Sequence, residues 1–204
     1  LAIRQAAGAN SLDTADAVRA GHPTVVATDR VGTAGRVQAW VCGSGLGTDE
    51  RAVAELRTVL ATPVPVCLDA DALTLIINGS MAEALRERRA PVVLTPHDRE
   101  FTRLDGGDPG ADRVEAALRL AAKVQAVVLL KGDRTVVATP DGRAFVNPTG
   151  TPVLATAGTG DVLTGIIAAL LATGGDAMQC ALAGVLLHAE SGDRAARAGE
   201  RGLI

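Results

Sequence analysis

Four short apolar segments, each followed at once by a glycine-rich or polar turn, constrain the fold of this chain more than any other feature. They occupy residues 37–42, 64–68, 91–95 and 126–130, and helix-like segments lie between them. Continuous apolar strands are typical of parallel sheets, whose neighbouring strands are joined by crossover helices. We therefore predict a doubly wound, mostly parallel α/β sheet whose ligand site lies along the carboxyl edge of the strands.

The remaining segments complete this pattern. A further short strand is expected at 24–28, and segments 135–139 and 144–147 flank a strong turn at 140–143, which predicts a hairpin and a short antiparallel portion at the sheet edge. Thr48 and Asp71 are the expected N-caps of the helices that follow them. Helices are expected at 12–20, 49–60, 72–77, 81–89, 98–104, 112–124, 159–172 and 176–198.

Composition excludes several classes of protein. The chain has 204 residues, 48% of them hydrophobic, and its longest apolar candidate, 163–171, is too short and too interrupted to span a membrane. The net charge of −3 arises from interspersed acidic and basic residues, which argues against a nucleic-acid or membrane surface. The cysteines Cys42, Cys67 and Cys180 lie far apart in apolar contexts, as expected for buried thiols in a reducing, cytoplasmic compartment.

Residues 157–161 open an alanine-rich helix and form the strongest candidate for a phosphate site. The first N–H groups of a helix have no partner within the helix, and Gly158 and Gly160 let an anion approach the backbone around Thr159 closely. Asp161 would repel a phosphate, but its position is explained if it accepts a proton from a hydroxyl that attacks the phosphate. The alternative is that Asp161 is a helix cap and the glycines form a turn.

Other polar residues follow the predicted strands directly. Lys131 is placed to meet a phosphate as a point charge, and His97 is placed to face a ligand. Each has a plainer interpretation, as a surface lysine beside a turn and as a structural histidine. Asp69 fits either turn formation or ligand binding, and the glycines of 43–47 are also typical of a tight turn between a strand and a helix.

Five motifs taken together resemble the ADP/ATP-dependent NAD(P)H-hydrate dehydratases, a family of the ribokinase-like superfamily. The last motif alone indicates only the superfamily, whereas all five, in order within residues 37–193, are more specific. The motifs are Gly43-Ser44-Gly45-Leu46-Gly47, Asp69-Ala70-Asp71-Ala72-Leu73, Thr95-Pro96-His97 followed by Glu100-Phe101, Lys131-Gly132, and Ala157-Gly158-Thr159-Gly160-Asp161.

Two departures from the family pattern affect these expectations. Ser44 stands where the family usually has proline, and the Gly-Gly-Ser…Pro-Gly-Ala stretch of the usual first strand and helix is missing; residues before about Ala20 match the pattern poorly. We therefore expect a single ribokinase-like domain over residues 1–204 that lacks the usual N-terminal βα unit and the extreme C-terminus.

The resemblance implies a three-layer α/β/α sandwich that dehydrates NADHX or NADPHX, the hydrated forms of NADH and NADPH, at the expense of ADP or ATP. It implies that Asp161 is the catalytic base and that Gly45, His97 and Asp161 bind the hydrate. Mg²⁺ is the implied metal, with no secure protein ligand in the sequence. The nucleotide would contact Lys131, Gly132, Asp133, Arg134, Thr135, Gly158, Thr159 and Gly160.

Two other classes of function stay open at this point. A kinase of the same superfamily, acting on a hydroxymethylpyrimidine or hydroxyethylthiazole alcohol, would share Asp161 and the phosphate site. A non-catalytic nucleotide-binding module is disfavoured because a carboxylate weakens phosphate binding. The resemblance also implies a homo-oligomer, with a tetramer as one form, and a fused or separate NAD(P)H-hydrate epimerase, but neither a nucleic-acid nor a membrane partner.

Overall fold

The computed structural model describes residues 11–26, 28, 30–77 and 79–198. Its six strands form one sheet in which the strand order equals the chain order. The first four strands are parallel and the last two are antiparallel, as predicted. The strands are β1 (Trp40–Cys42), β2 (Val66–Leu68), β3 (Val92–Leu94), β4 (Val127–Leu130), β5 (Val136–Ala138) and β6 (Ala144–Val146).

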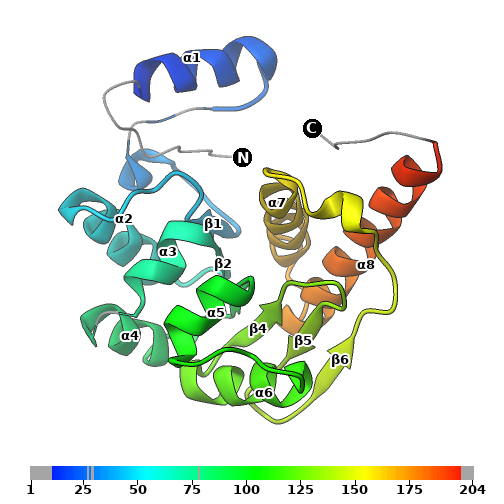
Figure 1. The fold of residues 1–204 in the computed structure, drawn as a ribbon. Helices are drawn as coiled ribbons and strands as arrows, with labels where there is room; N and C mark the ends of the chain where they lie inside the picture. The colour runs from blue at the N-terminus through cyan, green and yellow to red at the C-terminus, as the bar shows by residue number, and fades with distance from the viewer. Residues whose placement is uncertain (1–10, 27, 29, 78, 199–204) are drawn as a thin grey trace.

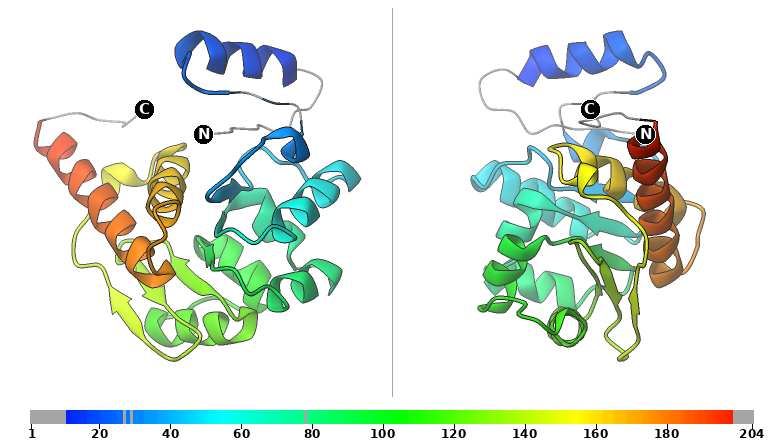
Figure 2. Two further views of the ribbon diagram at one scale, coloured as in Figure 1. Left: turned by 180° about the vertical axis from the view of Figure 1, so that it is seen from behind. Right: turned by 45° about the vertical axis from the view of Figure 1, so that its right-hand side comes forward.

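Helices cover both faces of the sheet and complete the three-layer sandwich (Figure 1). One face carries the helices that connect the parallel strands, and the other carries the last two helices of the chain (Figures 1 and 2). The first group comprises α2 (Glu50–Leu60), α3 (Ala70–Leu75), α4 (Gly79–Arg86), α5 (Asp98–Asp105) and α6 (Arg113–Val124). The second group comprises α7 (Thr159–Leu171) and α8 (Ala177–Arg197).

This arrangement differs from the doubly wound sheet expected from the sequence. The order of the described strands never reverses. Right-handed crossovers between successive neighbours all lie on one face of a sheet, so α2 to α6 share that face. The opposite face is left for α7 and α8, which follow the antiparallel hairpin.

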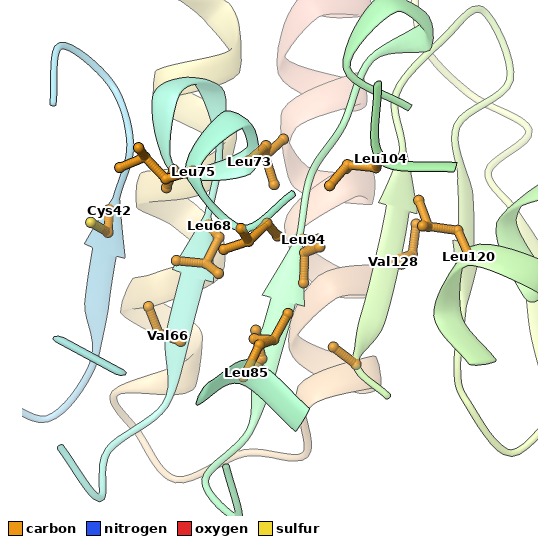
Figure 3. Packing of buried hydrophobic residues seen from close by; sticks show 14 of the residues in the cluster. Cys42, Val66, Leu68, Leu73, Leu75, Leu85, Leu94, Leu104, Leu120 and Val128 are labelled. Carbon is orange, nitrogen blue, oxygen red and sulfur yellow. The ribbon is translucent and has the colours of Figure 1, made fainter. Parts of the chain in front are cut away.

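Leucine and valine side chains fill the space between the sheet and the connecting helices. Leu68 and Leu94 from the strands meet Leu73 of α3 and Leu104 of α5, while Leu120 of α6 lies beside Val128 (Figure 3). A second cluster, with Ile167 and Leu171 of α7 and Val185 of α8, packs on the other face. Because both faces of β2, β3 and β4 are covered, these strands are apolar throughout, as the sequence pattern predicts.

Several local expectations are wrong at the N-terminal side. The described part of 24–28 forms no strand beyond an isolated bridge at Val26, and β1 begins at Trp40 rather than at residue 37. Asp49, not Thr48, caps α2 by accepting a hydrogen bond from the N–H of Ala52. The expected helix at 12–20 is present as α1 (Ser11–Gly21), which lies outside the three layers (Figures 1 and 2).

The longest described helix, α8, has 21 residues. No helix in the described ranges is both long enough and apolar enough to cross a membrane.

Candidate functional site

The turns that follow β1, β2, β3 and β4 lie at one edge of the sheet. Cys42 pairs with Leu68, which in turn pairs with Leu94, so these strands end level with one another. Backbone hydrogen bonds continue past the strand ends, for example from the N–H of Lys131 to the carbonyl of Pro96 at 2.8 Å. The residues predicted to meet a ligand after each strand are therefore neighbours in space.

The loop Gly43–Gly47 after β1 is held against the turn after β2. Gly43 has a φ of 142°, and a Cβ added to it would lie 1.7 Å from the carbonyl oxygen of Asp69, so only glycine fits there. At the other end of the loop, the N–H of Gly47 donates to the carboxylate of Asp71 at 2.8 Å. This bond corrects the expectation for Asp71: the carboxylate fixes the loop, and Asp69 takes the N-cap position of α3.

The helix α7 begins where the sequence predicted it to begin. Gly158 is in the left-handed conformation with a φ of 89°, and the helix begins at Thr159. The hydroxyl of Thr159 donates to the carbonyls of Leu154 and Thr156, at 2.6 and 2.8 Å, so this side chain secures the turn before the helix. The backbone N–H of Thr159 also donates to the Thr156 carbonyl, at 3.3 Å.

Lys131, Asp69 and Glu100 form a charged cluster beside this helix terminus. The Lys131 ammonium donates to Asp69 Oδ1 at 2.8 Å and lies 3.7 Å from Glu100 Oε2. A Cβ on Gly160 would lie 3.6 Å from Lys131 Nζ and 3.7 Å from Asp69 Oδ2, so the cluster is in contact with the start of α7. The sequence had left Lys131 as either a phosphate-binding or a surface lysine, and the structure places it in this buried cluster.

Burial dominates the electrostatics of Asp69, which is only 3% exposed. Burial raises the pKa of its carboxyl group above the usual range, the Lys131 ammonium opposes this rise, and the nearby Glu100 carboxylate adds to it. Ala70, the next residue, has a φ of 48°, which is a strained conformation for a residue with a Cβ. Such strain is retained where the surrounding structure enforces it, frequently at functional sites.

His97 has a structural role, which the sequence analysis left open as its plainer interpretation. It is the N-cap of α5, and its Nδ1 accepts hydrogen bonds from the N–H groups of Arg99 and Glu100. The Glu100 carboxylate in turn accepts a bond from the N–H of His97 at 2.8 Å, which completes a capping box. The imidazole Nε2 is 3.5 Å from Glu100 Oε2, so the half-exposed His97 side chain lies beside the charged cluster.

Asp161 lies in the first turn of α7 and bonds to the loop after β1. Its carboxylate Oδ1 accepts a hydrogen bond from the hydroxyl of Ser44, a residue 117 positions earlier in the chain. Gly45 belongs to the same loop and has a φ of 64°. The loop after β1 and the start of α7 are therefore brought together, as the shared role implied for Gly45 and Asp161 requires.

The predicted nucleotide segment 131–135 leaves the cluster as a loop before β5. The Thr135 hydroxyl donates to the carbonyl of Gly132 at 3.3 Å, whereas no described contact joins the side chains of Asp133 and Arg134 to the charged cluster. Arg113 of α6 lies beneath the loop and donates to the carbonyl of Lys131 at 2.8 Å.

Two residues of the site had no role assigned from the sequence. Arg113 also pairs with Asp98 at 2.7 Å, and nothing in the sequence around it signals a contact with a loop 18 positions later. Ser44 was noted only as a departure from the family pattern. The one feature of the sequence that could have indicated a role for Ser44 in the site was its position in a glycine-rich loop directly after a strand.

The described part of the site contains neighbouring carboxylates but not a complete set of protein ligands for a metal ion. Among the described residues, no three histidine, cysteine, aspartate or glutamate side chains converge in a way that could hold a metal. Asp69 and Glu100 already share one cation, the Lys131 ammonium. Two such carboxylates fit Mg²⁺, which is commonly bound by one or two carboxylates together with substrate phosphates and water.

Comparison with known proteins decides the family of the chain. The model of the NAD(P)H-hydrate dehydratase family matches residues 5–203. The chain belongs to this family. The match extends well beyond residues 37–193, to which the motifs were confined, and it includes the N-terminal residues that fit the motif pattern poorly.

Curated relatives in this dehydratase family include proteins of two lengths. The chain is 52% identical over 157 residues to the bifunctional NAD(P)H-hydrate repair enzyme Nnr of Mycobacterium tuberculosis, covering 77% of this chain and 33% of that protein. It is 41% identical over 194 residues to the ADP-dependent (S)-NAD(P)H-hydrate dehydratase of Neisseria meningitidis serogroup B, covering 92% of this chain and 66% of that protein. The chain thus spans about a third of the bifunctional relatives' length.

Solved structures confirm the predicted ribokinase-like fold. The ADP/ATP-dependent NAD(P)H-hydrate dehydratase of Bacillus subtilis, co-crystallised with ATP and Mg²⁺, has a TM-score of 0.78 at 32% identity, with 91% of this chain and 68% of that chain covered. The hydroxyethylthiazole kinase of Pyrococcus horikoshii has a TM-score of 0.70 at 16% identity, with 98% and 82% covered. The second likeness shows the fold alone, so the kinase alternative gains no support from it.

Proposed function

We propose that this protein repairs hydrated nicotinamide cofactors by dehydrating NADHX or NADPHX to NADH or NADPH with ADP or ATP. The observation that carries the proposal is that the Asp161 carboxylate, the glycine turn before α7 and the Lys131 ammonium lie close together. Asp161 directly follows Gly160, and a Cβ added to Gly160 would lie 3.6 Å from the Nζ of Lys131. Family membership over residues 5–203 supports the choice of substrate.

The proposed reaction begins with a proton transfer to Asp161. The carboxylate accepts the proton of the C6 hydroxyl of the hydrate as that oxygen attacks the terminal phosphoryl group of the nucleotide. The positive end of the α7 dipole, at Gly158–Asp161, stabilises the charge on the transferring phosphoryl group. Phosphate then leaves C6 with the C–O bonding electrons as the lone pair of the ring nitrogen forms a C=N bond, and loss of a C5 proton restores the dihydronicotinamide.

Lys131, Asp69 and Glu100 would bind the nucleotide phosphates and their Mg²⁺ ion. The Lys131 ammonium, now held by Asp69, is close enough to the helix terminus to turn toward a phosphate. Asp69 and Glu100 would then be free to hold Mg²⁺, which neutralises phosphoryl charge when it is bound. The loop of Gly132, Asp133, Arg134 and Thr135 would contact the remainder of the nucleotide, while Gly45 and His97 would contact the hydrate.

Further properties follow the same family pattern. We propose a cytoplasmic enzyme, which the burial of Cys42, Cys67 and Cys180 favours. A homo-oligomer and an NAD(P)H-hydrate epimerase partner, fused or separate, are also proposed. The bifunctional repair enzymes among the relatives support the epimerase partner.

Recovery of the reduced-nicotinamide absorbance band tests the proposed reaction directly. The full-length protein, Mg²⁺, ADP or ATP and the hydrate are expected to restore the band, with one nucleotide consumed and one phosphate released per cofactor. Leaving out the nucleotide is expected to abolish the signal, because the hydroxyl is then never converted into a good leaving group. A flat absorbance together with phosphorylation of a hydroxymethylpyrimidine or hydroxyethylthiazole alcohol would establish the kinase alternative instead.

A further inference from the structure

The loop that carries Ser44 is anchored at both ends. Gly43 packs on the carbonyl of Asp69 so closely that no side chain fits, and the N–H of Gly47 is bound by the Asp71 carboxylate at 2.8 Å. Within the loop, the N–H of Leu46 donates to the carbonyl of Gly43 at 3.0 Å. These contacts hold the Ser44 backbone in one place relative to the sheet edge, so its hydroxyl is presented from a fixed support.

The carboxylate of Asp161 has few other constraints. Asp161 is exposed, and rotation about the bond to a carboxylate group is broad and roughly two-fold, so packing does not select its orientation. Thr164 bonds to the Asp161 backbone carbonyl at 2.9 Å and leaves the carboxylate untouched. Across the described residues, the Ser44 hydroxyl is the one side-chain donor to this carboxylate.

The two carboxylate oxygens of Asp161 therefore have different surroundings. Oδ1 accepts the hydrogen bond from Ser44, which leaves Oδ2 for a substrate hydroxyl. A proton acceptor must lie within hydrogen-bond reach of the proton that it removes, so fixing one oxygen orients the other. Proline, which the family pattern usually places at position 44, has no side-chain donor, so this arrangement depends on the residue that this chain has there.

We propose that Ser44 is a positioning residue for the catalytic base: it binds Oδ1 of Asp161 and holds Oδ2 toward the hydroxyl of the hydrate. This inference rests on the proposed function, which makes Asp161 the proton acceptor. The hydrogen bond between Ser44 and Asp161 does not depend on that function. Ser44 takes no proton in the reaction. Its hydroxyl keeps its hydrogen and donates to the carboxylate before and after the proton of the hydrate is transferred to Oδ2.

Kinetics of single and double variants test this role. In the full-length protein, Ser44→Ala is expected to lower kcat for hydrate repair about tenfold, equivalent to about 1.4 kcal/mol, with the KM for nucleotide unchanged. Ser44→Thr retains the hydroxyl and is expected to retain most of kcat. In the Asp161→Asn background, Ser44→Ala is expected to cause no further loss, because the group through which it acts is already disabled. Ser191→Ala removes an exposed hydroxyl that bonds only to a backbone carbonyl and is the matched control.

Urea unfolding of the wild-type protein, Ser44→Ala, Asp161→Asn and the double variant supplies a measurement that does not depend on the substrate. The effects of Ser44→Ala and Asp161→Asn on the free energy of unfolding are expected to be non-additive if the two side chains are bonded. Unchanged kcat in Ser44→Ala, or an equal loss with and without Asp161→Asn, would overturn the positioning role. If the wild-type protein repairs no hydrate, the proposed function fails. Additive effects on unfolding would then show that the Ser44–Asp161 contact fails as well, and with it this inference.

Discussion

Replacing Lys131 with methionine is the most informative perturbation of the charged cluster. The substitution keeps an unbranched side chain but removes the ammonium that binds Asp69 at 2.8 Å. Asp69 and Glu100 have side chains that are 4% and 7% exposed, so both carboxylates would lose their shared cation while remaining buried. Breaking one partner of a buried ion pair costs about 3–5 kcal/mol. Since the Lys131 side chain is 20% exposed, we expect the lower end, a loss of about 3 kcal/mol in the free energy of unfolding near neutral pH.

The loss is expected to depend on pH, with a sign that follows from the pKa of Asp69. Burial raises this pKa from the ordinary value of 3.8, and the variant removes the lysine that opposes the rise. A carboxyl group whose pKa is higher in the folded state binds more protons there than in the unfolded chain. Folding is therefore penalised increasingly as pH rises from the unfolded value through the folded one. Below the unfolded value, where the group is protonated in both states, this penalty disappears.

Urea unfolding at pH 4.5 and pH 8 measures both the loss in the free energy of unfolding and its dependence on pH. The slope of the free energy against urea concentration is compared between variants. Lys131→Met is expected to lose more stability at pH 8 than at pH 4.5. Lys123→Met is the control, because that side chain is 45% exposed and lies 3.9 Å from its acidic partner. Adding Asp69→Asn to Lys131→Met is expected to recover part of the loss. A loss equal to that of the control at both pH values would refute the reasoning.

Three further outcomes are expected. Asp161→Asn should lower turnover by about 10²–10⁴-fold with nucleotide affinity kept or improved, and near-normal turnover would contradict its assignment as the base. Gly160→Val should weaken ADP or ATP binding in calorimetry, since its branches enter the space beside the charged cluster, while Gly165→Val, where a Cβ meets nothing within 4 Å, should not. Gly43→Ala should prevent normal folding, seen as a large fall in Tm, because its Cβ would lie 1.7 Å from the Asp69 carbonyl oxygen; an unchanged Tm would refute the close approach.

The core strands and helices were predictable because local pattern and burial agree there. β2, β3 and β4 are flanked by other strands on both sides and by helices on both faces, so their apolar runs had one interpretation. Strand propensity failed near the N-terminus, where most of residues 24–28 are β-branched but the described part forms only an isolated bridge. Propensity describes a residue that fits a sheet, but it does not supply the neighbouring strand.

The site was predictable to the level of which turns meet, because parallel strands end at a common edge. The pairings within it were not predictable. Thr48 and Asp49 are both good caps, and a shift of one residue decided between them. The rotation of α7 about its axis determines that Asp161 meets Ser44, and the packing of α6 brings Arg113 to the Lys131 carbonyl. Both depend on how whole helices pack, which the local sequence does not encode.

Because the strand order equals the chain order, each parallel strand can pair with the one synthesised just before it. Early sheet contacts are therefore close in sequence, a property associated with rapid folding. The exception is α7, which follows all six strands yet returns to cover the first two through contacts with β1 and β2. The bond between Ser44 and Asp161 spans 117 residues and forms only after this return. During synthesis, Asp161 therefore reaches Ser44 only after the described strands have been made, and formation of this contact on refolding would report the docking of α7 rather than formation of the sheet.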